Sequence, residues 1–291
     1  MTKEKKIGLL VNLIVYVVAF AIGFVPYYFV MKNGYPIEAM FIFTMVATLV
    51  VVIPMLIIKN TSLYDPYWSV APFVMAVIHM IFVSKFTINS IIFTAITFWY
   101  AFRLTLNWAI TYKGLNPKYE DWRYADFRHS LPAWKFQFIN LTGLTYVPTI
   151  VVFAALVPGF YFMDISTFNP LTIIGLVIMA FGPLLELIAD HQTHKFIKDC
   201  NDHSKVCDYG LWKYSRHPNY LGELTFWFGI AVTMLLADIT QWYVCLGYIL
   251  MVVLFFLASI PLMEKHNLKK RPSYKEYQKT TSVLLILPRK K

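Results

Sequence analysis

The chain has 291 residues, of which 58% are hydrophobic and only 14% are charged, and its formal net charge is +10. Soluble domains carry about 25% charged residues, so this composition excludes a soluble globular protein and predicts an all-α, polytopic membrane helix bundle. The three cysteines are too few for a disulfide scaffold, and the sequence contains no nucleic-acid-binding motif.

Eight apolar segments of about 20 residues, the length that a bilayer requires, follow one another along the chain. The third is short and bounded by polar residues, and the fourth carries Arg103. We predict membrane-spanning helices near residues 7–29, 37–58, 68–82, 87–110, 138–162, 171–189, 220–236 and 242–262.

The basic residues predict how these spans are oriented. Lys32 and Lys85 lie in loops on one side of the predicted membrane and Arg103 lies in a span, whereas the rest of the 26 Lys and Arg residues lie on the opposite side. The positive-inside rule makes that opposite side cytoplasmic, together with both termini. We therefore expect a protein of the bacterial inner membrane whose active site faces the cytoplasm.

The polar sequence gathers on the same side. It comprises two loops, at residues 112–135 and 191–213, and a tail from residue 264 onward. Ionisable residues within spans are costly and are by default functional candidates. Five of them are predicted near the cytoplasmic ends of their spans, which suggests one shared cavity: Asp65, Arg103, Glu186, Asp190 and Glu223.

The segment 211–223, with the sequence LWKYSRHPNYLGE, is the most informative stretch. Arg216 and His217 directly precede Pro218, which is typical of the first turn of a helix. Asn219 and Glu223 are four residues apart and share one face of that helix. Helix N-terminal N–H groups beside a fixed cation suit a phosphate, so the segment predicts a site for an anionic cofactor.

Other residues are assigned to the same predicted site by their chemistry. Arg216, Lys195 and Arg271 can neutralise phosphates, Asn219 and Asp190 can bond ribose or carboxamide groups, and Tyr214 or Tyr220 can stack on a ring. The absence of a Gly-x-Gly-x-x-Gly fingerprint argues against a Rossmann site. The predicted cofactor-binding residues are Glu186, Asp190, Lys195, Tyr214, Arg216, His217, Asn219, Tyr220, Glu223, Arg271, Tyr274 and Tyr277.

Two structural alternatives apply to this set. Glu186 and Asp190 can instead pair with Lys195 and Arg216. A cluster of His and Cys residues between the sixth and seventh predicted spans matches no zinc motif, and we predict no metal site there; its members are His191, His194, Cys200, His203 and Cys207.

Several motifs together resemble a family of membrane proteins of unknown function, DUF1295, that is related to the steroid 5α-reductases and sterol reductases. The motifs are YSRHPNYLGE at 214–223, SLYDPYW at 62–68, DWRY at 121–124, ADHQ at 189–192 and RPSYKEY at 271–277, with Glu264 before the last. One departure is that His194-Lys195 replaces a Lys directly after Gln192. The Arg-His-Pro-x-Tyr piece also resembles isoprenylcysteine carboxyl methyltransferases, which bind S-adenosylmethionine in a related fold.

The resemblance implies a seven-span reductase core with an extra N-terminal helix, in one membrane domain over residues 1–291. Residues 7–58 would form the N-terminal helices, 65–135 the substrate side and 186–291 the cofactor-binding half. The implied activity is NADPH-dependent reduction of a C=C bond in a hydrophobic, steroid-like enone. The implied partners are that substrate and membrane lipid, with no nucleic acid, and the protein would be a monomer or weak oligomer.

The resemblance also carries catalytic roles to Asp65 and Tyr100, with Arg103 three residues after the Tyr. Enone reduction needs hydride at the β-carbon, a proton at the α-carbon and a donor for the enolate oxygen, which a Tyr beside a carboxyl group can supply. The relatives have Gln-Glu where this chain has Tyr64-Asp65. Structural alternatives are a helix-capping Asp65, an interfacial Tyr100 and a snorkelling Arg103. The alternative functions are an S-adenosylmethionine-dependent methyltransferase of the isoprenylcysteine type and a lipid-binding scaffold.

Overall fold

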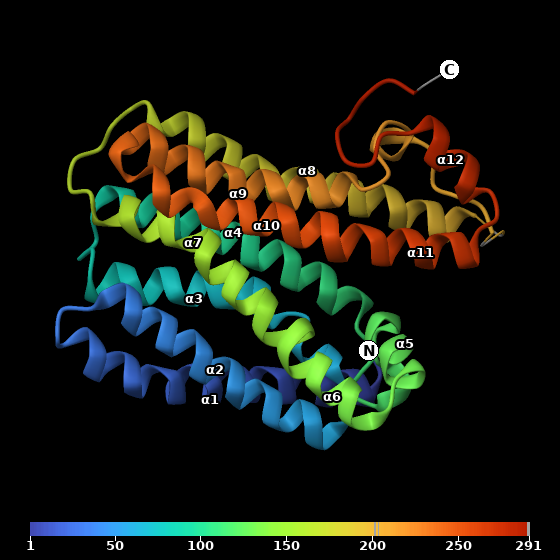
Figure 1. The fold of residues 1–291 in the computed structure, drawn as a ribbon, viewed down its shortest axis with the longest axis horizontal. Coiled ribbons are helices and arrows are strands. Elements are labelled where there is room, and N and C mark those ends of the chain that lie inside the picture. The colour runs from blue at the N-terminus through green and yellow to red at the C-terminus, as the bar shows by residue number, and fades with distance from the viewer. Residues whose placement is uncertain (201, 203, 290–291) are drawn as a thin grey trace. The chain divides into compact units, whose positions relative to one another are not determined.

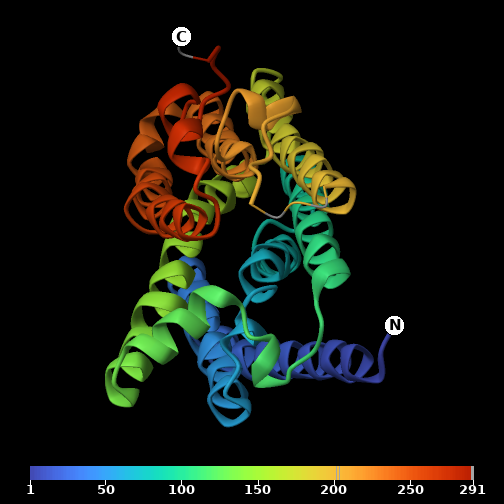
Figure 2. The same ribbon diagram turned by 90° about the vertical axis from the view of Figure 1, so that its right-hand side faces the viewer.

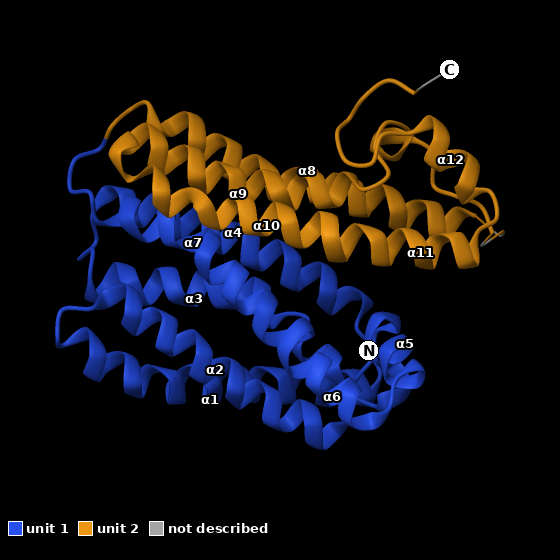
Figure 3. Cartoon of the chain, in the orientation of Figure 1, with its two compact units in different colours: residues 1–168 blue, residues 169–291 orange. Residues whose placement is uncertain are grey.

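A computed structural model describes residues 1–200, 202 and 204–289. Within that part of the chain the regular secondary structure is helical, and one isolated parallel bridge joins Ser215 to Ser282. The chain divides into two compact units, unit 1 over Met1–Phe168 and unit 2 over Asn169–Lys291 (Figure 3). The predicted substrate-side residues 65–135 fall in unit 1, and the predicted cofactor half 186–291 falls in unit 2.

Unit 1 consists of two helix pairs and a further long helix that contacts both pairs. The pair α1 and α2 packs together, as does the pair α3 and α4, and α7 contacts α2, α3 and α4 (Figure 1). Thr2 and Thr87 cap α1 and α4 through their hydroxyl groups, which accept the orphan N–H groups of the first turn. The helices are α1 (Lys3–Met31), α2 (Pro36–Ile58), α3 (Tyr67–Phe82), α4 (Ile88–Thr111), α5 (Trp122–Ser130), α6 (Ala133–Leu141) and α7 (Val147–Asp164).

Unit 2 is a bundle of long helices that carries the polar segments at one end. Figure 2 shows these helices nearly end-on, viewed from the end at which α12 lies. A 3₁₀ segment (Ile239–Cys245) connects α9 to α10, and a π-helical turn (Phe255–Ser259) connects α10 to α11. The helices are α8 (Thr172–Asp199), α9 (Pro218–Ala237), α10 (Leu246–Leu254), α11 (Ile260–Lys270) and α12 (Tyr274–Thr280).

Glycines allow α8 and α9 to approach backbone to backbone. A Cβ added at Gly182 would lie 2.5 Å from the Phe226 nitrogen and 2.6 Å from the Gly222 carbonyl oxygen. One added at Gly222 would lie 2.7 Å from the Gly182 oxygen. Small residues at facing positions are the usual means of close helix packing in membranes, because dispersion contacts replace the hydrophobic effect there.

The structure confirms the predicted helical, membrane-spanning architecture in its main features. All eight predicted spans are helical. Among the described residues, seven helical segments are long and apolar enough to cross a membrane: Lys3–Met31, Pro36–Ile58, Thr61–Phe82, Ala133–Asp164, Thr172–Asp199, Pro218–Ala237 and Ile239–Lys270. The predicted fourth span forms α4, which is not among these seven.

Two predicted boundaries are wrong. The loop predicted at 191–213 begins as helix, because α8 continues to Asp199, and the helix of the eighth span continues to Lys270 instead of ending near residue 262. No Gly or Pro occurs between residues 184 and 209, so nothing in the sequence ends α8 at the point where hydropathy falls. Asp190, Lys195 and Glu264 therefore lie on rigid helices.

Candidate functional site

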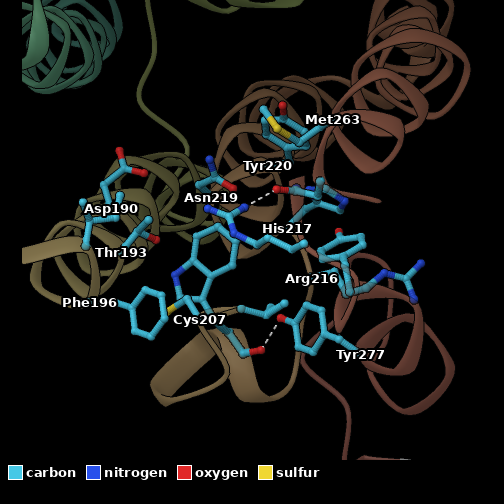
Figure 4. Close-up of a pocket in the computed structure, with 16 residues that line it drawn as sticks. Asp190, Thr193, Phe196, Cys207, Arg216, His217, Asn219, Tyr220, Met263 and Tyr277 are labelled. Atoms are coloured by element: carbon cyan, nitrogen blue, oxygen red, sulfur yellow. Dashed lines mark hydrogen bonds between the residues drawn. The ribbon is translucent and has the colours of Figure 1, made fainter. Parts of the chain in front are cut away.

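Unit 2 contains a pocket of about 260 Å³ at the polar end of its bundle. Asp190, Thr193 and Phe196 of α8 lie on one side of it and Tyr277 of α12 lies on the other (Figure 4). Eight of the twelve predicted cofactor residues line the pocket: Asp190, Arg216, His217, Asn219, Tyr220, Arg271, Tyr274 and Tyr277.

The start of α9 forms part of the pocket wall as predicted from the Arg-His-Pro sequence. His217 is the N-cap residue and Pro218 is the first residue of the helix. The His217 and Tyr220 rings stack with their centroids 5.1 Å apart and an interplanar angle of 7°. The Trp212 indole faces the same pocket, and its Nε1 donates to the Ala189 carbonyl at 2.9 Å. Aromatic surface and helix N–H groups therefore adjoin one cavity.

Arg216 lines this pocket, but protein groups occupy most of its donors. Its Nε donates to Glu264 at 2.6 Å, and its Nη1 donates to the carbonyls of Gln278 at 2.7 Å and Thr281 at 2.9 Å. The guanidinium thus caps the carbonyl end of α12. These hydrogen bonds join the residue before His217, the N-cap of α9, to α11 and to the end of α12, and the phosphate role of Arg216 stays a prediction.

Glu264 is the centre of this network, which we call the Glu264 clamp: Arg216, His217, Glu264, Tyr274 and Gln278. Besides Arg216, its carboxylate accepts from Gln278 Nε2 at 2.7 Å, faces His217 Nε2 at 3.2 Å and accepts from the Tyr274 hydroxyl at 3.3 Å. Glu264 belongs to one of the motifs of the family resemblance but is not among the predicted site residues. Its position 48 residues after Arg216 gave no spacing signal.

Arg271 is the pocket cation that remains available to a ligand. Its Nη1 bonds Asn267, whereas its buried Nε has no hydrogen-bond partner among the described residues. A buried N–H without an acceptor is costly, and such a group inside a pocket points to an acceptor on a ligand. The phosphate-binding role predicted for Arg271 fits this geometry.

Four predicted cofactor residues do not line the pocket. Glu186 and Glu223 are 4% and 3% exposed on the facing helices α8 and α9, and Glu223 accepts from Trp227 Nε1 at 2.6 Å. Neither lines the pocket, and their cofactor role stays a prediction. Tyr214 and Lys195 are exposed to the outside.

Burial affects the titration of three groups in the pocket wall. It raises the pKa of the Cys207 thiol to about 11 and raises the pKa values of Tyr274 and Tyr277 above the ordinary range, so all three are neutral at physiological pH. Within the described part of the chain, no three His, Cys, Asp or Glu side chains are placed to hold a metal ion. His203, a member of the cluster considered above, lies outside the described residues.

Unit 1 carries a separate acidic cluster around Asp65. The Tyr124 hydroxyl donates to Asp65 Oδ1 at 2.6 Å, and Arg123 Nη2 lies 3.5 Å from the same oxygen. The Asp121 carboxylate accepts from Arg123 Nε at 2.7 Å, and the Asp121 N–H donates to Ser62 Oγ at 2.8 Å. The DWRY segment thus folds over the residues that precede α3.

A second ion pair fixes this fold. Arg128 donates to both oxygens of Glu120, at 2.6 and 2.8 Å, and Glu120 also accepts the Thr61 N–H at 2.8 Å. Burial and the neighbouring Asp65 carboxylate raise the pKa of Tyr124 well above its usual value. Tyr124 is therefore a protonated phenol held against a carboxylate.

The phenol beside Asp65 is Tyr124, which is not among the predicted site residues, whereas the predicted partner was Tyr100. Tyr100 and Arg103 lie on α4 and are 0% and 4% exposed, so neither is the interfacial or snorkelling residue that the structural alternatives describe. The catalytic role of Tyr100 stays a prediction. The DWRY motif was the available signal for Tyr124, but its 59-residue separation from Asp65 concealed the contact.

Comparison with known proteins identifies the family. The chain belongs to the family described as protein of unknown function (DUF1295), which it matches over residues 50–281. It is 25% identical over 251 residues to the uncharacterized protein C594.04c of Schizosaccharomyces pombe, an alignment that covers 76% of this chain and 71% of that protein. No solved structure matches the chain.

Proposed function

We propose that this DUF1295 protein is an NADPH-dependent reductase that acts on the C=C bond of a hydrophobic enone, with steroid-like ketones as the reference substrates. The observation that carries the proposal is the pocket of unit 2, where a buried Arg271 Nε without a partner, a helix N-terminus and aromatic rings adjoin one cavity. These are the groups that a phosphorylated, ring-bearing cofactor requires.

The pocket residues suggest how the cofactor would be held. Arg271 and the first N–H groups of α9 suit a phosphate, Asn219 and Asp190 suit hydroxyl or amide groups, and the Trp212 ring suits stacking. When bound, NADPH supplies the hydride, and the protein contributes binding and orientation.

Tyr124 and Asp65 suit the other half of the chemistry. Hydride addition at the β-carbon breaks the C=C bond and places negative charge on the carbonyl oxygen, and a proton then adds at the α-carbon. A protonated Tyr124 can donate a hydrogen bond to that oxygen, which replaces Asp65 as its acceptor. Asp65 and Arg123 would fix the direction of the phenol before the substrate binds, and Tyr100 is the alternative phenol.

The proposed setting follows from hydropathy and charge. Apolar helices accommodate a lipid-soluble enone that enters from the bilayer. The basic, polar ends of the units would face the cytoplasm of a bacterial inner membrane.

A methyltransferase that uses S-adenosylmethionine is a second candidate. The pocket combines the Asp190 carboxylate with the Trp212 and Tyr274 rings, and this combination also suits a sulfonium cation. This candidate gives Asp65 and Tyr124 no chemical role.

The first experiment measures ligand binding to the detergent-purified protein. Calorimetry and thermal unfolding are carried out with NADPH, NADH and S-adenosylmethionine side by side. We expect stabilisation by NADPH that is lost in Arg271→Gln and retained in Lys270→Gln, a matched charge change at an exposed neighbour outside the pocket. Stabilisation by S-adenosylmethionine alone would replace the reductase with the methyltransferase.

Turnover is then tested with a panel of 3-oxo-Δ4 steroids and other apolar enones. NADPH oxidation must be matched by a product two hydrogen atoms heavier. If NADPH bound but no enone were turned over, the assignment of the cofactor would stand and the assignment of the substrate class would be wrong.

A further inference from the structure

The segment of residues 282–289, which we call the tail segment, is fixed against the residues that precede α9. The Arg216 N–H donates to the Ser282 carbonyl at 2.8 Å, and the Ser215 hydroxyl donates to the Leu284 carbonyl at 2.6 Å. The Leu287 N–H donates to the Tyr214 carbonyl at 3.3 Å. Figure 1 shows this part of the chain after α12. The tail segment therefore has a defined position in unit 2.

Its apolar side chains are nevertheless exposed. Leu285, Ile286 and Leu287 are 56%, 41% and 49% exposed, and the neighbouring Tyr214 is 38% exposed. Three consecutive exposed aliphatic residues on a segment that three hydrogen bonds hold in place are not a solvent loop. Such contiguous apolar surface marks an interaction site.

A groove of about 620 Å³ runs beneath the tail segment. Its lining includes Val283, Leu284 and Leu287 of the tail segment together with Phe256. Phe256 belongs to the helical segment Ile239–Lys270, one of the segments long and apolar enough to span a membrane. The groove thus leads from a candidate membrane span to the polar end of unit 2.

Basic side chains lie around the groove and the tail segment. Lys279 lines the groove, Lys213 is exposed beside Tyr214, and Arg289 Nε donates to the Lys213 carbonyl at 3.0 Å. Two of them have acidic neighbours: Lys279 pairs with Glu276 at 2.9 Å and Arg289 with Asp208 at 3.4 Å. Such exposed pairs contribute little and exchange readily for another anion.

We propose that this groove binds an acyl chain of an anionic membrane phospholipid, whose phosphate contacts Lys279 and Arg289. Exposed aliphatic and aromatic side chains flanked by Lys and Arg are the combination that inserts at an anionic bilayer surface. Because Arg216 also lines the groove and caps α12, bound lipid would reinforce the Glu264 clamp. The site does not depend on the identity of the cofactor.

The test uses the full chain in nanodiscs that contain phosphatidylglycerol or phosphatidylcholine with a diazirine on the acyl chain, at equal mole fraction. After irradiation, labelled peptides are quantified by mass spectrometry. We expect labelling of residues 282–289 to be several-fold higher with phosphatidylglycerol. Equal labelling by the two lipids, or labelling no higher than that of the peptide around the exposed Leu268, would overturn the proposal.

Two variants separate the acyl and headgroup contacts. Val283→Trp should fill the groove and abolish the labelling, whereas Leu268→Trp should leave it unchanged. The double substitution Lys279→Gln with Arg289→Gln should remove the preference for phosphatidylglycerol, whereas Lys269→Gln with Lys270→Gln should retain it. A preference that persists in the first double variant would contradict the assignment of these side chains, even if Val283→Trp fails to fold.

Discussion

Replacing Glu264 by Gln should release α12 from the rest of unit 2. Glu264 and Arg216 are 15% and 9% exposed, and the carboxylate also serves Gln278, Tyr274 and His217. Gln has nearly the same shape, but its amide places a donor where the carboxylate accepts. Breaking one partner of a largely buried pair costs about 3 kcal/mol.

That cost predicts a measurable opening. About 1.4 kcal/mol corresponds to a factor of ten, so the ratio of the closed to the open state of the clamp should fall roughly a hundredfold. Hydrogen–deuterium exchange of the Tyr274–Thr280 helix reports this opening directly. We expect its protection to fall by a similar factor, together with a lower Tm in detergent.

Glu276→Gln is the matched control. It makes the same chemical change on α12, but Glu276 pairs with Lys279 at 2.9 Å while both side chains are 65–70% exposed. Exposed pairs of this kind contribute about 0.5 kcal/mol or less. If exchange in the two variants differed by less than about twofold, some other interaction would hold α12 in place and the reasoning from the Glu264 clamp would fail.

Three further predictions concern separate parts of the chain. Tyr124→Phe should lower turnover by about 10²–10⁴-fold without changing NADPH affinity; unchanged turnover would return the donor role to Tyr100. The rate of Cys207 alkylation should rise about tenfold per pH unit up to its raised pKa of about 11, because the thiolate is the reactive form. NADPH should slow this alkylation, and Cys200, which lies outside the pocket, serves as the internal standard. Gly182→Ala should lower stability by about 1–3 kcal/mol in denaturant titrations, whereas Gly143→Ala, whose added Cβ would meet only Ile139 at 3.8 Å, should not.

Hydropathy was sufficient to predict the helices, because a span must be long and apolar wherever it lies in the fold. It was not sufficient to predict their ends. The helix α8 continues to Asp199 since helix propensity, unlike hydropathy, does not change at a membrane boundary. This is why Thr193 and Phe196, which belong to the predicted loop 191–213, line the pocket from a helix.

The pocket was predictable where its residues lie close together in sequence. Asn219 and Tyr220 follow from the first turn of α9, whose chemistry is local. The contacts of Arg216 with Glu264 and of Asp65 with Tyr124 join residues 48 and 59 positions apart, and no spacing rule reports them. These long-range hydrogen bonds are the part of the two sites that the sequence did not predict.

The two arginines of the pocket differ in how many of their donors bond to protein groups. Arg216 has its Nε and Nη1 groups on Glu264, Gln278 and Thr281, so these donors can reach a phosphate only if their present hydrogen bonds break. The Arg271 Nε is buried without a partner, and leaving such a donor unsatisfied costs about 1–3 kcal/mol unless a ligand accepts from it. Substitution of Arg216 therefore acts through the position of α12 and would weaken the binding of any ligand in the pocket, whereas substitution of Arg271 removes one internal hydrogen bond, to Asn267, and the buried donor that we assign to an anion. For that reason Arg271→Gln, and not a change at Arg216, discriminates between a phosphorylated cofactor and other ligands.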